Sequence, residues 1–534
     1  MLLQANELTI SVPTRTLLEV KSLEVYEGDR IGLIGKNGTG KSTLLHTLAG
    51  EVEPERGEII RYSTVSLLPQ LKKHTGHKSG GEVTQRYIQQ AFSKQNGLLL
   101  ADEPTTHLDQ KHIEWIEQLF SQWQGAFIVV SHDRAFLDAV CTKIWEIADE
   151  TIHQYVGNYE VYSVQKQQAL ETKRQAYENY QAKKQQLERA IMKKEQKASR
   201  ATKKPKQLSR SEAKITGAKP YFAKKQKKLQ QTAKALETRL EKLEKVEKPF
   251  EEKPLQMHIP FQEKLSGRNI IQVAHLDGKV GNKMLWDDAN FFIRGGDKVA
   301  IIGENGAGKT TLLRKLLTDK EHVTISSACK IAYFKQDLTL LDEEASILDN
   351  VKETAIHDET LIRTVLARLH FYRDDVYKQV NVLSGGERVK VALAKLFLSN
   401  SNALILDEPT NFLDIEAMEA LEKLLLEYEG TVLFVSHDRR FVEKIATKII
   451  AMEEGELIFF DGTYEQFQQR NSEDKRNVEE QLLLIETKIS DVLSRLSLEP
   501  SKDLEAEFQA LLQQKRTLQK EVAGTKLQSS PKTW

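Results

Sequence analysis

The chain has 534 residues, of which 29% are charged, and its 77 lysines and arginines balance 77 aspartates and glutamates. This length accommodates two or three domains, and apolar runs such as 127–130 are far shorter than the roughly 20 residues that cross a bilayer, which excludes a membrane channel. The two cysteines, Cys141 and Cys329, lack CxxC spacing, and the first residues form no basic and apolar leader. We therefore expect a cytoplasmic protein without disulfides, a zinc site or a signal peptide.

A phosphate-binding loop follows an apolar strand near the start of the chain. Residues 35–42 read Gly-Lys-Asn-Gly-Thr-Gly-Lys-Ser and precede an amphipathic segment, which predicts strand, loop and helix in that order. Glycines let backbone N–H groups turn inward around phosphates, the lysine meets the β and γ charges, and the hydroxyl ligates Mg²⁺. The alternative is an ordinary glycine-rich turn before a helix. The predicted nucleotide-binding residues of this loop are Gly35, Asn37, Gly38, Gly40, Lys41, Ser42 and Thr43.

An apolar strand over 98–101 leads into the acidic pair Asp102 and Glu103. The aspartate can accept a hydrogen bond from water on Mg²⁺, and the glutamate can orient or deprotonate the water that attacks the γ-phosphate. Acidic pairs at strand ends are also common turn residues. The phosphate loop upstream and the sequence Ser-His-Asp around His132 downstream favour the catalytic interpretation.

The middle of the chain is highly charged. Residues 159–200 lack proline and have a helical composition, and 224–248 resume a helical pattern, which predicts two antiparallel helices with a tip at about 200–222. About 17 lysines and arginines between 183 and 228 face three acidic residues, a density that favours a polyanion such as RNA over a merely solvated face. Two aromatic rings at the tip could stack on bases or pack internally. The predicted contact residues are Lys203, Lys204, Lys206, Arg210, Lys214, Lys219, Tyr221 and Phe222.

The second half of the chain repeats the first. Gly-Asp-Lys-Val-Ala-Ile-Ile-Gly at 296–303 matches 28–35, and Ser-His-Asp-Arg at 436–439 matches 131–134. This repeat predicts a tandem duplication of an α/β unit built on a parallel sheet. The equivalent nucleotide-binding residues are Gly303, Asn305, Gly306, Gly308, Lys309, Thr310 and Thr311. The equivalent acidic and histidine residues are Asp407, Glu408 and His437.

Taken in order, these motifs resemble the ATP-binding cassette family over nearly all of both halves. The family signature LSGGE is intact at 383–387 and has one departure at 78–82, and the family's D-loop aspartates correspond to Asp109 and Asp414. The resemblance implies that each half binds ATP and Mg²⁺ and that the halves close head to tail. Catalysis would then involve Glu103, Glu408, His132 and His437. The ATP caps would be Ser79, Gly80, Gly81, Ser384, Gly385 and Gly386. The Mg²⁺ site would use Ser42, Gln70, Asp102, Thr310, Gln336 and Asp407.

Two features depart from the family pattern. No aromatic residue that could stack on adenine occurs at 11–15 or 279–283, which leaves the choice between ATP and GTP open. Nine positions separate Gln70 from Ser79, against 48 from Gln336 to Ser384. The first half is therefore expected to lack most of the helical subdomain with which transporter ATPases grip their membrane partners.

A tandem cassette pair with a basic helical linker resembles the ABC-F family, and within it the Vga-type antibiotic-resistance proteins, over the whole chain. The resemblance implies a monomer that occupies the ribosomal exit site with ATP bound and contacts large-subunit rRNA and the peptidyl-site tRNA. Its linker would displace streptogramin A, lincosamide and pleuromutilin antibiotics, and ATP hydrolysis would release the protein. A general translation factor for stalled ribosomes is the nearest alternative. An exporter ATPase subunit is a more distant alternative, because membrane spans are absent and the linker is basic. A DNA-binding ATPase is also more distant, because the tail at 475–520 has no basic excess.

The expected fold class is α/β, with two tandem cassettes joined by a long antiparallel helical linker and followed by a C-terminal helical hairpin. The expected domains are 1–160 and 251–468 for the cassettes, 161–250 for the linker and 469–534 for the C-terminal extension.

Overall fold

The computed structural model describes residues 1–13, 15–70, 97–106, 108–200, 218–246, 265, 267–335, 340–453, 455–498, 505–506 and 508–516. Contacts divide the chain into two units, residues 1–159 with 254–534, and residues 160–253. Within the described ranges, no helix combines the length and the apolar character needed to cross a membrane.

The first half of the larger unit contains two sheets. A six-stranded sheet has the order β5-β6-β7-β3-β8-β9, parallel except for the antiparallel pair β8–β9, and a three-stranded antiparallel sheet has the order β2-β1-β4. Helices α1, α3 and α4 lie between these strands in sequence. The elements are β1 (Leu3–Val12), β2 (Arg15–Val25), β3 (Arg30–Gly35), α1 (Lys41–Ala49), β4 (Arg56–Arg61), β5 (Val65–Leu68), β6 (Leu98–Asp102), α3 (Gln110–Gln122), β7 (Ala126–Val130), α4 (Arg134–Val140), β8 (Lys143–Ala148) and β9 (Thr151–Val156).

The second half repeats this topology strand for strand. Its six-stranded sheet has the order β14-β15-β16-β12-β17-β18, and its three-stranded sheet has the order β11-β10-β13. The predicted duplication of an α/β unit is therefore confirmed. The elements are β10 (Asn269–Val280), β11 (Lys283–Arg294), β12 (Lys298–Gly303), α8 (Lys309–Thr318), β13 (Val323–Ile325), β14 (Ile331–Phe334), α9 (Ile347–Lys352), α10 (Glu359–Arg368), η2 (Arg373–Tyr377), η3 (Val380–Val382), α11 (Gly385–Phe397), β15 (Ala403–Asp407), α12 (Ile415–Glu427), β16 (Thr431–Val435), α13 (Arg439–Ile445), β17 (Lys448–Glu453) and β18 (Glu456–Phe460).

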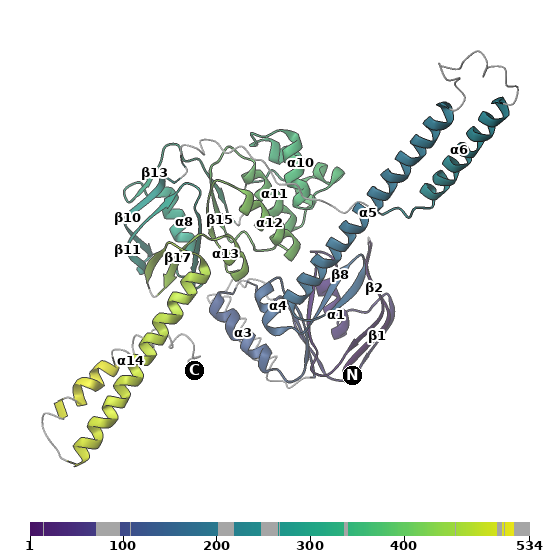
Figure 1. Cartoon of the computed structure of the whole chain (residues 1–534). Helices are drawn as coiled ribbons and strands as arrows, with labels where there is room; N and C mark the ends of the chain where they lie inside the picture. The colour runs from purple at the N-terminus through teal and green to yellow at the C-terminus, as the bar shows by residue number, and fades with distance from the viewer. Residues whose placement is uncertain are drawn as a thin grey trace. The chain divides into compact units, whose positions relative to one another are not determined.

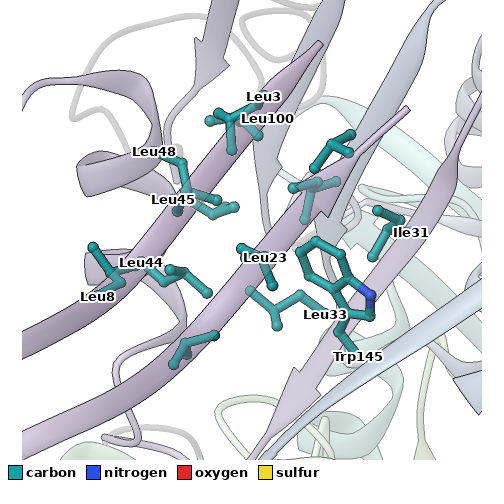
Figure 2. Close-up of a cluster of buried hydrophobic side chains, with 14 of the residues drawn as sticks. Leu3, Leu8, Leu23, Ile31, Leu33, Leu44, Leu45, Leu48, Leu100 and Trp145 are labelled. Atoms are coloured by element: carbon teal, nitrogen blue, oxygen red, sulfur yellow. The ribbon is translucent and has the colours of Figure 1, made fainter. Parts of the chain in front are cut away.

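The core of the first half forms where α1 meets the two sheets. Strands β6 and β7 are buried along their whole length, as expected for parallel strands covered on both faces. Leu44, Leu45 and Leu48 of α1 lie among strand residues such as Leu33 and Trp145 (Figure 2). Each fully buried leucine contributes roughly 1.5–3 kcal/mol, so this cluster fixes α1, and with it the preceding loop, on the sheet.

The smaller unit contains two long helices, α5 (Tyr159–Arg200), whose first residue belongs to the larger unit, and α6 (Ala218–Glu241). Figure 1 draws α6 alongside the second part of α5, and Leu187, Ala198 and Ala233 are buried although most residues around them are polar and exposed. The helix expected at 159–200 is confirmed. The expected start of the second helix at 224 is wrong, because α6 already begins at Ala218. Pro220 lies in its first turn, where the missing N–H would have had no partner within the helix.

Position 469, the expected start of the C-terminal extension, lies within α14 (Tyr464–Leu498), which continues directly from the second half. Tyr464 and Phe467 are buried at its start. Residues 508–516 are helical again, and Lys515 Nζ lies 2.9 Å from Glu486 Oε1 of α14. The chain therefore turns back on itself here, as a helical hairpin requires.

Candidate nucleotide sites

The two phosphate loops adopt the same backbone conformation. Each joins a central strand to a helix, β3 to α1 and β12 to α8. Three glycines in each loop have positive φ angles: 154°, 78° and 96° for Gly35, Gly38 and Gly40, and 151°, 81° and 107° for Gly303, Gly306 and Gly308. Side chains larger than hydrogen are strained in this region, so the glycines are needed for the loop path itself.

The lysine of each loop is folded back onto the loop. Lys41 Nζ donates to Gly35 O at 2.7 Å and to Lys36 O at 3.0 Å, and Lys309 Nζ donates to Gly303 O at 2.9 Å and to Glu304 O at 3.0 Å. Burial lowers the pKa of both lysines, and nearby carboxylates oppose the shift. Both ammonium groups are thus held over the loops, where a phosphate can exchange for the two carbonyls.

A carboxylate and a hydroxyl meet beside each lysine. Thr310 Oγ1 donates to Asp407 Oδ1 at 3.3 Å, and Ser42 hydrogen-bonds Asp102 in the same way. Burial raises the pKa of both aspartates, and buried Asp102 Oδ1 has no hydrogen-bond partner among the described residues. Mg²⁺ prefers oxygen ligands and keeps phosphate and water oxygens in its shell, so one carboxylate and one hydroxyl per loop fit that ion.

The two candidate catalytic glutamates are held in a strained conformation. Glu103 and Glu408 have φ angles of 51° and 52°, values that residues with a Cβ rarely adopt. Their backbone N–H groups donate to Val130 O at 2.9 Å and to Val435 O at 3.1 Å, in the adjacent strands. Outliers of this kind cluster at active sites and persist only where the surrounding structure holds them.

The candidate switch histidines lie against these glutamates. His132 Nε2 is 3.1 Å from Glu103 Oε1, and His437 Nε2 is 3.2 Å from Glu408 Oε1. Burial lowers the pKa of His132, and burial together with the Lys309 charge lowers the pKa of His437 to about 3. At neutral pH both imidazoles are therefore uncharged and can act as hydrogen-bonding groups rather than as cations.

The two halves contact each other reciprocally at the phosphate loops. Asp414 Oδ2 accepts from the backbone N–H of Asn37 at 3.0 Å, and Asp109 Oδ2 accepts from that of Asn305, also at 3.0 Å. The same two aspartates cap their own helices α12 and α3. Burial opposes ionisation of Asp109, but hydrogen bonds from His112 and Asn305 hold its pKa below the usual range. Each carboxylate therefore joins the helix start of one half to the loop of the other.

The signature of the second half lies at the phosphate loop of the first. A Cβ on Gly386 would be 3.0 Å from Asn37 Nδ2, and Asn37 Nδ2 itself donates to Phe412 O at 3.0 Å. Ser384 caps α11, and its Oγ donates to Glu387 Oε2 at 2.6 Å. The N-terminus of α11 thus lies beside the loop that contains Lys41, which is the place that the head-to-tail arrangement requires.

For the remaining predicted site residues, the described part of the structure shows no contact with a phosphate loop. Gln70 lies two residues after β5 and is exposed. The positions outside the described residues are Ser79, Gly80, Gly81, Gln336, Lys203, Lys204, Lys206, Arg210 and Lys214. Lys219, Tyr221 and Phe222 lie in the first turns of α6, and only their backbone is described.

Comparison with known proteins gives the same assignment. Family models described as ABC transporter match residues 18–76 and 286–411, and 145–223. The chain is 33% identical to ribosome protection protein VmlR of Bacillus subtilis (strain 168), over 92% of this chain and 93% of that protein. It is 35% identical to erythromycin resistance ATP-binding protein MsrA of Staphylococcus epidermidis, over 83% of this chain and 96% of that protein. It is 30% identical to ABC transporter F family member 5 of Arabidopsis thaliana, over 85% of this chain and 75% of that protein. This chain belongs to the ABC-F family. It is accordingly an ATP-hydrolysing enzyme built from two tandem cassettes.

The two cassettes of this ABC-F protein also meet away from the phosphate loops, through contacts that the sequence did not reveal. Arg134, directly after the candidate switch sequence, forms a buried ion pair with Glu422, and Lys444 Nζ lies 2.8 Å from the same carboxylate. At the equivalent position Arg439 lies 3.5 Å from Glu117 and is more exposed. The tandem alignment could have suggested these pairs, because both arginines and both glutamates occupy equivalent positions, but pairing across the interface depends on how the cassettes dock.

The position where the adenine-stacking aromatic was missing contains an arginine. Arg15, the first residue of β2, donates from Nη2 to Gly38 O at 2.7 Å. The Arg15 cation is therefore held against the first phosphate loop. It lies on the β1–β2 hairpin, whose sequence lacks the aromatic residue that could stack on adenine. The equivalent position in the second hairpin, by the register of the two strand pairs, is Lys283.

Proposed function

We propose that this chain is a ribosome-protection ATPase that closes on two ATP molecules, binds the ribosomal exit site and uses its helical arm, residues 161–250, to release antibiotics from the peptidyl-transferase centre. One phosphate loop and the opposite signature would enclose each ATP. Hydrolysis would open the cassettes and release the protein into the cytoplasm. The arm would act on rRNA and the peptidyl-site tRNA, with streptogramin A, lincosamide and pleuromutilin drugs as the expected spectrum.

The observation that carries this proposal is the combination of reciprocal cassette contacts with a cationic helical arm. On α5, Lys193, Lys197 and Arg200 are exposed near the tip, and on α6, Lys224 and Lys228 are exposed. Clustered cations release counterions from a nucleic acid backbone, which gives strong binding that depends on salt. The names of VmlR and MsrA, a ribosome protection protein and an erythromycin resistance protein, add support from relatives that align over most of the chain.

The geometry supplies a mechanism for each site. The γ-phosphate would displace the loop carbonyls from Lys41 or Lys309, and the neutral histidine beside each glutamate would donate a hydrogen bond to it. Glu103 or Glu408, each beside a switch histidine, would then orient and deprotonate the attacking water. Ser42 with Asp102, and Thr310 with Asp407, would hold Mg²⁺, which neutralises the charge that develops on the phosphates.

The decisive experiment traps the ATP-bound protein. The variant carrying both Glu103→Gln and Glu408→Gln would be expressed in a Gram-positive host, purified in ATP, and imaged by cryo-electron microscopy with whatever copurifies. We expect ribosomes with the protein at the exit site and the 200–222 tip near the peptidyl-transferase centre. Free protein, protein on DNA, or protein in a membrane fraction with a dedicated partner contradicts the proposal.

The drug spectrum needs a separate measurement. Growth of a sensitive host expressing the chain would be scored against lincomycin, a streptogramin A, a pleuromutilin and erythromycin, with Lys41→Ala plus Lys309→Ala as the inactive control. We expect raised inhibitory concentrations for the first three drugs. Ribosome binding without any change in drug tolerance would instead favour the general translation factor.

A further inference from the structure

Two ion pairs cross the cassette interface at equivalent places but with opposite polarity. Lys36 Nζ of the first phosphate loop lies 3.3 Å from Glu416 Oε2 of α12. Glu304 of the second phosphate loop forms an ion pair with Lys111 of α3. All four side chains are partly exposed, between 34% and 56%. The first cassette thus contributes two cations to these contacts, and the second contributes two carboxylates.

These four residues occupy matching positions of the duplication. Lys36 and Glu304 are both the second residue of a phosphate loop, and Lys111 and Glu416 are both the second residue of the helix that a D-loop aspartate caps. The charge therefore inverts at both positions between the two halves. A contact that pairs a loop with the opposite helix is attractive only when one partner is a first cassette and the other a second cassette.

Pairing between like cassettes reverses these contacts. Two first cassettes in the same arrangement would place Lys36 against Lys111 at both loops, and two second cassettes would place Glu304 against Glu416. Three of the other interface contacts do not discriminate, because both halves contain the loop asparagine, the D-loop aspartate and the arginine and glutamate of the buried pair. Like charges placed against each other exclude wrong partners more effectively than exposed attractive pairs select right ones.

We propose that Lys36, Lys111, Glu304 and Glu416 form a charge code that directs the first cassette to close on the second cassette of the same chain and opposes closure between like cassettes of two chains. The tether between the cassettes favours the same chain further, since it holds the partner at a high effective concentration. This pairing code does not depend on the ribosomal function proposed above.

The test compares a mismatched code with a restored one. The mismatched chain carries Lys111→Glu and Glu416→Lys, which leaves like charges at both contacts within a chain but makes each cassette complementary to its own copy. The restored chain adds Lys36→Glu and Glu304→Lys, which re-establishes both pairs with inverted polarity. Both chains also carry Glu103→Gln and Glu408→Gln, so that ATP is not consumed.

Closure would be measured at saturating ATP by energy transfer between labels on non-natural amino acids at two exposed positions, Tyr62 and Ile356, one in each cassette. Exposed pairs each contribute a factor of about two to five. We therefore expect the closing equilibrium of the mismatched chain to fall about tenfold, and that of the restored chain to return to within about twofold of the parent. Sedimentation should show the parent and restored chains as monomers. If additional dimer forms, we expect it only for the mismatched chain.

A matched control lies within one cassette. Lys352 Nζ is 2.7 Å from Glu359 Oε2, and these side chains are as exposed as the coding residues, at 41% and 46%. Lys352→Glu should leave closure unchanged. Closure of the mismatched chain equal to that of the parent overturns the charge code, as does a restored chain that remains open. A parent chain that dimerises through exchanged cassettes on adding ATP overturns the assignment to a single chain.

Discussion

At the scale of single residues, the strained glutamates give the first prediction. Each phosphate loop is bound by a D-loop aspartate of the other cassette, so loss of hydrolysis at one site should slow the other. Glu103→Gln alone and Glu408→Gln alone should each reduce steady-state phosphate release by more than half, and the double variant should reduce it by about 10²-fold or more, as expected when a general base is removed.

The asymmetry between the cassettes, from Lys78 in the first signature and the short sequence between Gln70 and Ser79, predicts unequal turnover for the two single variants. Phosphate release measured under single-turnover and steady-state conditions would reveal the difference. Indistinguishable rates for the two variants would remove this hypothesis, and the double variant serves as the low-activity control.

A second residue-scale prediction concerns Asp133, which caps α4. Burial, together with the nearby Asp438 carboxylate, raises its pKa from 3.8 to about 6, while Phe136 N–H and Arg439 oppose the shift. The folded state therefore binds this proton more tightly than the unfolded state. The associated stability is present below about pH 4 and is lost as the pH rises to about 6.

Asp133→Asn keeps the helix cap and removes the ionisable group. It should increase the free energy of unfolding at pH 8 by on the order of 2 kcal/mol relative to the parent, with a clearly smaller gain at pH 4.5. Denaturant unfolding of both chains at the two pH values measures this difference, and a gain independent of pH contradicts it.

Sequence motifs alone predicted some of the site residues and their contacts but not all of them. The order of glycines, lysine, hydroxyl, acidic pair and histidine predicted which side chains would gather at each phosphate loop, because these motifs follow strands of one sheet whose carboxyl ends meet. The order of motifs did not reveal that Asp109 and Asp414 bind the opposite loops, because a carboxylate followed by a helix is also typical of an ordinary helix cap. Positions 377 residues apart meet only after docking.

At the scale of elements, the contact of α4 with α12 predicts unequal roles for two equivalent arginines. Arg134 is 5% exposed and its partner Glu422 is fully buried, whereas Arg439 is 22% exposed and Glu117 is 18% exposed. Arg134→Ala leaves the buried Glu422 carboxylate with Lys444 as its remaining ion-pair partner among the described residues, so it should destabilise the chain by about 3 kcal/mol. Arg439→Ala should cost about 1 kcal/mol or less.

Urea unfolding of the two variants would measure this difference, with Arg174→Ala as a control because, within the described residues, Arg174 pairs with an exposed glutamate one turn away on α5. Equal destabilisation by Arg134→Ala and Arg439→Ala would show that burial does not distinguish the two pairs.

The helical arm gives a second prediction at this scale. Replacing Lys193, Lys197, Lys224 and Lys228 with glutamine should weaken ribosome binding and lower the slope of affinity against salt, because fewer counterions are released. ATP hydrolysis by the free protein should not change. Cosedimentation with ribosomes at several salt concentrations tests this, and an unchanged slope contradicts it. A matched control replaces the same number of exposed residues of the arm, Gln185, Gln186, Gln196 and Gln230, with serine.

The sequence pattern predicted the bounds of one helix of the arm correctly and misplaced the start of the other. The helix at 159–200 was placed correctly because its composition is uniformly helix-forming over 42 residues. The expected start of α6 was too late because Pro220 interrupts the helical sequence pattern, although in a first turn proline removes only an N–H that no helix bond would use.

At the scale of the whole molecule, the duplicated topology was predictable from repeated motifs, but the polarity of the interface was not. Residues such as Lys36 and Glu304 vary within otherwise matching motifs and look like neutral surface differences in each half alone. The energetic effect of each charge depends on the residue that it faces across the interface. A chain assembled from two copies of either half would keep every catalytic motif and lose this complementarity.

The shared D-loop carboxylates have a final consequence for timing. Asp109 and Asp414 each cap a helix of one cassette and bind the phosphate loop of the other, so the geometry of one site is coupled to that of the other. In the proposed mechanism, two ATP molecules would be bound together in the closed chain, and the loss of one γ-phosphate would loosen both sites. The protein would behave as a coincidence detector, whose time in the closed state is set by the faster of its two hydrolysis events rather than by their average.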